Sequence, residues 1–78
     1  MKYTNGLTNG IYDILAPLIG ASMADATIKL QTKKIGRTEE TLGKSDLPEM
    51  TKLIKQSLVV FIGSAGADTI GKKIESAG

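Results

Sequence analysis

The sequence predicts an all-α protein, because apolar residues recur at helical spacing and one helical unit occurs twice. Shifting the chain against itself by 43 positions aligns several pairs of identical residues, among them Ile19 with Ile62, Gly20 with Gly63, and Asp25 with Asp68. Similarity at a fixed offset indicates a repeated structural unit. No stretch shows the strict alternation of apolar and polar residues that is typical of strands. We therefore expect a hairpin of two long helices in a single domain, residues 1–78.

The first unit is predicted to be a helix over residues 9–35 that follows a flexible arm at residues 1–8. The arm contains two turn-forming Thr-Asn-Gly triplets, and Thr8 or Asn9 is expected to cap the helix. Pro17 lies inside the helical pattern. An interior proline removes a backbone donor and clashes with the preceding turn, so we expect a kink near this residue.

The second unit is predicted to be a helix over residues 46–76, joined to the first by a polar loop at residues 36–45. Asp46 can cap this helix, and Pro48 suits its first turn. No proline stands at the position equivalent to Pro17, so the second helix is expected to run straighter.

The composition favours self-association of these helices. Residues 58–67 are apolar on every side of the expected helix, whereas a two-helix hairpin has only one internal interface. A chain of 78 residues buries little surface, and without cysteine it has no disulfide to stabilise it. We therefore predict a four-helix bundle formed by a homodimer. The predicted helix-packing and dimer interface comprises Gly20, Ala24, Gly63, Ala67, Ile19, Leu58, Phe61 and Ile62.

Residues that usually perform catalysis are scarce. Histidine and cysteine are absent, which removes the commonest metal ligands and the usual acid–base residue near neutral pH. Two equivalent carboxylates, Asp25 and Asp68, could share a proton or hold a metal if they were close. Each precedes a lysine by four residues, however, which favours exposed ion pairs with Lys29 and Lys72. We expect no enzyme activity, no cofactor and no metal.

A basic cluster gives an alternative function. A hairpin would gather Lys33, Lys34, Arg37, Lys52 and Lys55 near one end, where they could contact the phosphates of a nucleic acid. Acidic residues share this end, and lysines are favoured near a helix C-terminus in any case. Nucleic-acid binding is therefore the second hypothesis.

Neither a membrane span nor a signal peptide is expected. The apolar stretches at residues 14–24 and 58–67 are each about half as long as the roughly 20 residues that a spanning helix needs. A single lysine before the apolar run is a weak positive region for a signal peptide, and Asp13 at the edge of that run also argues against one. These features predict a cytoplasmic protein that does not bind membranes.

One combination of residues is similar to a known family. The matching residues are Leu15, Ile19 and Gly20, followed by Asp46, Leu47, Glu49, Met50 and Leu53. They resemble a small helical accessory module near the ends of bacterial signalling proteins such as kinases and regulators. That module has an Ile-Gly-Pro-hydrophobic-Ala run followed by an Asp-Leu-x-x-Leu helix, whereas Ala21 and Ser64 occupy the proline position here. The resemblance implies a protein-interaction or regulatory role without catalytic residues. We predict a small interaction or regulatory module that acts by homodimerisation, with another protein as a further partner.

Overall fold

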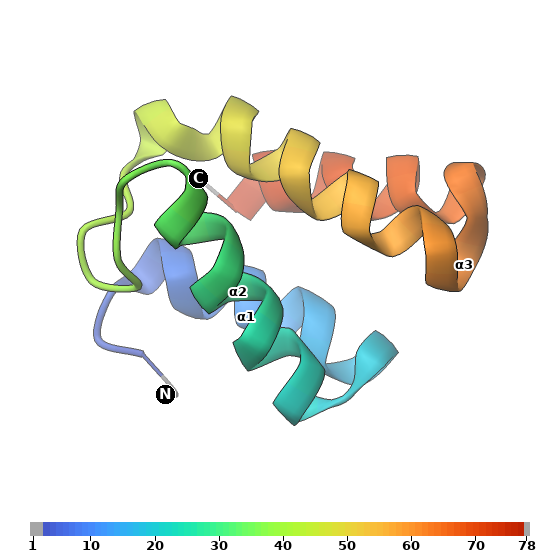
Figure 1. The fold of residues 1–78 in the computed structure, drawn as a ribbon, viewed down its shortest axis with the longest axis horizontal. Helices are drawn as coiled ribbons and strands as arrows, with labels where there is room; N and C mark the ends of the chain where they lie inside the picture. The colour runs from blue at the N-terminus through green and yellow to red at the C-terminus, as the bar shows by residue number, and fades with distance from the viewer. Residues whose placement is uncertain (1–2, 78) are drawn as a thin grey trace.

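The computed structural model describes residues 3–77, and every regular element in this range is helical. The elements are α1 (Gly6–Ile19), α2 (Ala21–Lys34), a short 3-10 helix η1 (Lys44–Asp46) and α3 (Leu47–Ala77). Gly63 has a non-helical backbone and divides α3 into a first arm, residues 47–62, and a second arm, residues 64–77. The two arms fold back beside each other, as α1 and α2 do (Figure 1). The chain therefore consists of hairpin 1 (α1 and α2) followed by hairpin 2 (the arms of α3).

Each hairpin turns at a glycine whose φ is positive. Gly20 has φ 90° and ψ 154°, and Gly63 has φ 76° and ψ 169°. Only glycine adopts this conformation readily, because a Cβ would clash with the backbone. A Cβ added to either glycine would meet no atom within 4 Å outside the adjacent residues. These glycines therefore reverse the chain, and they do not provide the close helix approach that the sequence suggested.

The prediction of two long helices was wrong for this reason. The first break lies at Gly20 and not at Pro17, which stays within α1. Helical hydrogen bonding continues up to the break, since the N–H of Gly20 donates to the carbonyl oxygen of Ala16 at 2.9 Å. The ring of proline fixes φ near −65° and cannot supply the positive φ of a chain reversal. Gly63 breaks the second unit in the same way, so that unit is not straight either.

Helix α1 begins earlier than the sequence indicated. It starts at Gly6, and the side chain of Asn5 caps it by accepting hydrogen bonds from two backbone N–H groups of the first turn. The predicted caps, Thr8 and Asn9, are instead buried residues inside the helix. The predicted arm is therefore helical from Gly6 onwards, while its residues 1–2 lie outside the described part of the chain.

A connector, residues 35–43, joins the two hairpins. Gly36 at φ 74° follows the end of α2, and Leu42 anchors the connector in the core. The carboxylate of Asp46 accepts a hydrogen bond from the backbone N–H of Gly43 at 2.9 Å. Asp46 therefore stabilises the start of η1, in place of the predicted cap on α3.

The core is built from equivalent positions of the two hairpins. Three pairs of identical apolar residues separated by 43 positions are buried in both copies: Ile11 and Ile54, Leu15 and Leu58, and Ala24 and Ala67. One polar link crosses between the hairpins, where Gln31 Nε2 donates to Ser57 Oγ at 2.9 Å. The sequence repeat is therefore also a repeat of burial, and the four helical segments enclose one apolar core within a single chain.

The glycine breaks give a test of the fold. Replacing Gly63 by alanine should lower the free energy of unfolding by about 1–3 kcal/mol, because the side chain strains a positive-φ backbone. Gly6→Ala is the matched control, since Gly6 is helical and a Cβ there would meet no atom within 4 Å outside the adjacent residues. Urea unfolding, monitored by circular dichroism, measures the free energy of unfolding of both variants. Equal stability of the Gly63→Ala and Gly6→Ala variants would contradict the chain reversal at Gly63.

Candidate interaction surface

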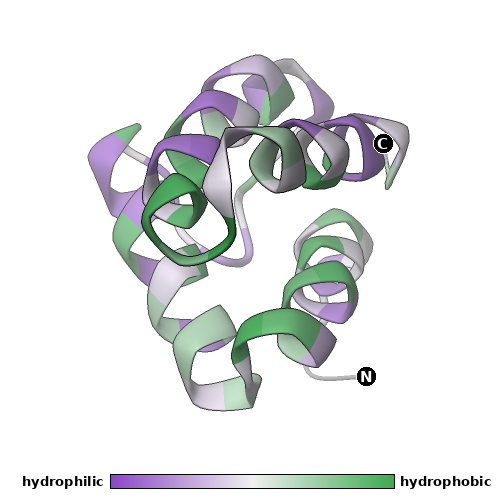
Figure 2. Cartoon of the chain, turned by 90° about the vertical axis from the view of Figure 1, so that its right-hand side faces the viewer, coloured by the Kyte–Doolittle hydropathy of each residue, from purple (hydrophilic) through white to green (hydrophobic). Residues whose placement is uncertain are grey.

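The tips of the two hairpins lie at the same end of the molecule. Figure 1 shows the turn between α1 and α2 and the turn within α3 on the same side, opposite the connector. Both tips are formed by uncharged stretches, residues 14–24 and residues 56–67. Viewed from this end, the ribbon nearest the reader is largely hydrophobic (Figure 2). Both hairpin tips at this end are therefore formed by stretches without charged residues.

This end exposes several large apolar side chains, which we call the apolar end. Their exposed fractions are 49% for Leu18, 45% for Met23, 44% for Val59, 84% for Val60 and 61% for Phe61. One other large apolar side chain, Leu30, is 53% exposed, and it lies in the C-terminal half of α2, away from the tip. Isolated exposed apolar residues are normal on soluble proteins, whereas a group of them marks an interaction site.

The exposure follows from the position of the breaks. Leu15 and Leu58 lie one turn before the reversal and are buried between the hairpins. Leu18 and Phe61, three residues later, lie where the neighbouring helices end, so no segment of the described chain covers them. Ile19 and Ile62 lie beneath this surface, partly buried against the core. The apolar end is therefore supported by the core and not by a mobile loop.

The structure distributes the predicted interface residues over two environments. Ala24, Ala67 and Leu58 are buried in the core of the chain's own fold. They pack helices within one chain and are not accessible to a second copy while this fold persists. Phe61 is exposed at the apolar end together with Gly20 and Gly63.

Sequence reasoning missed Leu18, Met23, Val59 and Val60 as surface residues. On the straight helices that the sequence predicted, an apolar stretch is expected to be covered by a neighbour. The sequence did contain one indication of these tips, because Gly20 and Gly63 stand at the same place in two uncharged stretches. Both glycines have positive φ in the structure, where the helix breaks and a hairpin tip forms.

Ion pairs mark the boundary of the apolar end. Asp25 pairs with Lys29 at 3.1 Å, as the spacing of four residues predicted. Asp68 instead pairs across hairpin 2 with Lys55, at 2.9 Å. The hydrogen bond and the charge of Lys55 hold the pKa of Asp68 below its usual value, with a smaller contribution from Lys72. Both pairs are accessible to solvent and stabilise the fold only slightly.

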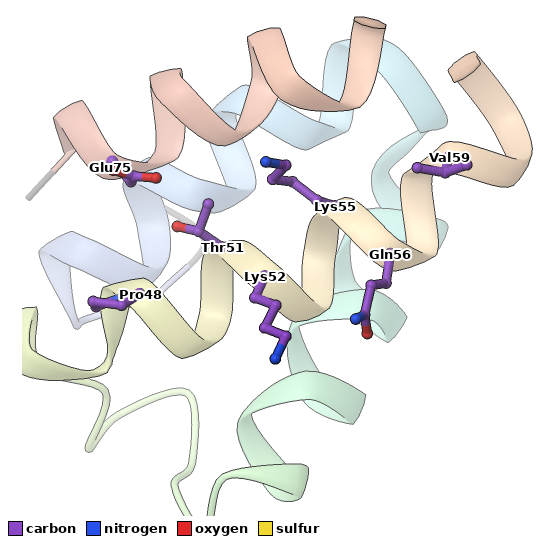
Figure 3. A pocket seen from close by; sticks show the side chains of 7 residues that line it. All are labelled: Pro48, Thr51, Lys52, Lys55, Gln56, Val59 and Glu75. Carbon is purple, nitrogen blue, oxygen red and sulfur yellow. The ribbon is translucent and has the colours of Figure 1, made fainter. Parts of the chain in front are cut away.

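A glycine makes the Lys55 pair possible. A Cβ at Gly71 would lie 2.6 Å from Cδ of Lys55, so any larger residue would force the aliphatic part of this lysine to shift from its place between the two arms of α3. Figure 3 shows Lys55 directed towards the second arm, whereas Lys52 points to the other side. Gly71 therefore provides the close packing that the sequence suggested for Gly63.

Tyr3, which precedes α1, contacts both helices of hairpin 1. Its hydroxyl donates to the carboxylate of Asp25 on α2, and its ring packs edge-on against Tyr12 on α1, with ring centroids 5.7 Å apart. Burial raises the pKa of Tyr3, and the neighbouring Asp25 carboxylate raises it further. Tyr3 therefore remains protonated and fastens α2 to α1.

The predicted basic cluster is partly neutralised. Arg37 pairs with Asp46 at 3.2 Å, and Lys55 is engaged by Asp68. Lys33 and Lys34 are exposed at the end of α2, and Lys52 is exposed on the first arm of α3. Two of the five cations therefore already have acidic partners, which weakens the field that a nucleic acid would encounter.

A shallow groove runs along the first arm of α3. Its volume is about 330 Å³, close to the lower limit for small-molecule sites. It is lined by Pro48, Thr51, Lys52, Lys55, Gln56, Val59 and Glu75 (Figure 3). Its charges are mixed, and its lining contains no histidine or cysteine. Among residues 3–77, no group of three acidic side chains is placed to hold a metal ion.

The segment Lys44–Ala77 is long and apolar enough, by length and composition alone, to cross a membrane. In the structure this segment reverses direction at Gly63, and each of its arms is shorter than the roughly 20 residues of a spanning helix. Comparison with family models, curated proteins and solved structures gave no match.

The depressed carboxyl pKa values predict a pH dependence of stability. The hydrogen bond from Gly43, together with Arg37, keeps the pKa of Asp46 below its usual 3.8, as Lys55 does for Asp68. The unfolded chain therefore binds protons at higher pH than the folded chain does, so this stabilisation is complete above pH 3.8 and is lost as the pH falls through the folded-state values.

Urea unfolding between about pH 6 and pH 2 should show this loss. The Asp46→Asn variant should lose less stability on acidification than the unmodified chain, whereas Glu49→Gln, which removes an exposed carboxylate from α3, should follow the unmodified chain. Identical acid profiles for Asp46→Asn and the unmodified chain would contradict this assignment.

Proposed function

We propose that this protein is a small helical interaction module that forms a homodimer through its apolar end and has no catalytic role. The observation that carries the proposal is the joint exposure of apolar side chains from both hairpin tips at an end without charged residues. A second copy offers a surface of the same chemistry. A two-fold dimer would pair this surface with itself, which is the commonest arrangement of homo-oligomers.

The magnitude of the exposed surface is consistent with weak association. Fully burying a large apolar side chain contributes about 1.5–3 kcal/mol, and the five side chains of the apolar end are on average about half exposed. Burying them on two copies would contribute about 8–17 kcal/mol, against an association cost of about 4–15 kcal/mol. The gain and the cost are of similar size, so the area argument allows weak association only. Dimerisation would therefore depend on protein concentration.

The proposed dimer differs from the four-helix bundle that the sequence predicted. Each chain already packs four helical segments around its own core, so a dimer needs no exchange of helices. Two complete units would meet end to end, with Phe61 and Val60 near the centre of the contact. Such a module could bring together two proteins to which it is attached, in agreement with the regulatory role implied by the resemblance.

Nucleic-acid binding has less support. Arg37 and Lys55 are held in ion pairs, and the exposed lysines are accompanied by Glu39 and Glu40 on the connector. Aromatic residues suitable for stacking on bases are few in this chain.

Light scattering over a dilution series tests the proposal. The unmodified chain should change from dimer to monomer on dilution, and Phe61→Lys should remain monomeric, because a charge at the apolar end would have to be desolvated in the dimer. Leu30→Lys is the matched control. It introduces the same charge at an apolar residue of similar exposure away from the tip, and it should dimerise like the unmodified chain.

Two outcomes would overturn the proposal. Equal dimerisation of Phe61→Lys and Leu30→Lys would place the interface elsewhere. A chain that is monomeric at every concentration but sediments with neutral phospholipid vesicles, and loses this property in Phe61→Lys, would assign the apolar end to a lipid surface.

A further inference from the structure

The side chain of Asn5 joins helix α1 to the connector. Its oxygen accepts hydrogen bonds from the N–H groups of Leu7 and Thr8, at 2.9 and 3.2 Å. Its Nδ2 donates to the carbonyl oxygens of Glu40 and Leu42, at 3.0 and 2.9 Å. An amide is the only side chain of this size that both accepts and donates in this way. Asn5 therefore holds the connector, which carries the buried Leu42, against the start of hairpin 1.

Asn5 is followed by glycine, and this combination is chemically reactive. The backbone nitrogen of the residue after an asparagine can attack the side-chain amide carbon, and glycine hinders this attack least because it has no Cβ. Gly6 is exposed and is the first residue of α1, so its N–H has no partner within the helix. The backbone of Asn5 is extended, with φ −74° and ψ 116°.

A second Asn-Gly pair provides an internal comparison. Asn9 and Gly10 lie inside α1, where the backbone is helical and Asn9 is buried. The N–H of Gly10 belongs to the regular hydrogen bonding of the helix. The attack at this pair requires the helix to open first, which is a rare event in the interior of a packed element.

We propose that Asn5–Gly6 is a site of spontaneous chemical modification, at which Asn5 is converted to aspartate or isoaspartate. The nitrogen of Gly6 loses its proton and forms a bond to Cγ of Asn5. The bond from Cγ to the side-chain nitrogen breaks, and that nitrogen leaves with a proton as ammonia. Water then opens the resulting succinimide at one of its two carbonyl carbons. Opening at the side-chain carbonyl retains the normal backbone linkage and gives aspartate. Opening at the backbone carbonyl gives isoaspartate.

The modification weakens the attachment of the connector, which Thr8 and the buried Leu42 also hold. An aspartate at position 5 still accepts the hydrogen bonds of the helix cap, but it has lost both donors to the connector. Its negative charge also faces the two carbonyl oxygens of Glu40 and Leu42. Isoaspartate adds a carbon atom to the main chain and displaces the cap as well. The connector lies at the opposite end from the hairpin tips (Figure 1), so this inference does not depend on the proposed dimer.

The full chain and its variants are aged at mildly alkaline pH. Peptide mapping with mass spectrometry then compares the rates of conversion at Asn5 and Asn9. Conversion at Asn5 should be at least about tenfold faster than at Asn9, because release of the cap contacts of Asn5 frays only the end of α1, whereas Asn9 requires the interior of the helix to open. Gly6→Ala should abolish most of the conversion at Asn5. Gly10→Ala is the matched control and should leave it unchanged, since a Cβ at Gly10 would make an ordinary contact with Ala77 at 3.5 Å. Faster conversion at Asn9 than at Asn5 would overturn the assignment, as would an unchanged rate of conversion at Asn5 in the Gly6→Ala variant.

A second measurement tests the consequence. Asn5→Asp should accelerate amide hydrogen exchange in residues 38–43 relative to the unmodified chain. Thr4→Asp adds the same charge one residue earlier, at an exposed position, and should not affect exchange in the connector. Unchanged exchange in Asn5→Asp would show that the amide of Asn5 does not hold the connector, and it would overturn the proposed effect of the modification.

Discussion

The fold depends on two backbone reversals at positive φ, at Gly20 and Gly63. Each reversal turns one apolar stretch into two helical segments that pack against each other, so four segments can surround one core in a chain of only 78 residues. A chain this short gains little from a two-helix interface. Because both reversals occur at the same point of the repeat, the two hairpins present equivalent residues to the core.

The same reversals create the apolar end. A helix can bury a side chain only where a neighbouring segment covers it, and at a hairpin tip both segments end. Leu15 and Leu58 are therefore buried, whereas Leu18 and Phe61 lie beyond the cover of the hairpins. Apolar residues are therefore exposed at both tips, and both tips lie at the same end of the molecule (Figure 1).

The sequence predicted the helical class and the Asp25–Lys29 pair, because these depend on local spacing. It did not predict the break at Gly63, since an interior glycine costs only about 1 kcal/mol in a helix and gives no sign of whether φ is positive. It also paired Asp68 with Lys72, although the structure pairs it with Lys55 across the hairpin. That contact exists only after the chain has reversed, and it also needs the space at Gly71. The contact between Lys55 and Asp68 was missed because it is tertiary, whereas the cap at Asn5 is local and was missed because the second Thr-Asn-Gly triplet offered an equivalent cap.

The two ends of the molecule are held by different interactions. At the connector end, Asn5 and Thr8 donate to backbone carbonyl oxygens of residues 39–42, and Arg37 pairs with Asp46. These polar contacts are directional, and they are largely satisfied within one chain. At the tips the contacts are apolar, and part of the surface remains uncovered. Association through the tips would therefore add burial without altering the core or the connector. The proposed dimer could therefore form and dissociate with concentration while the fold of each chain stays the same.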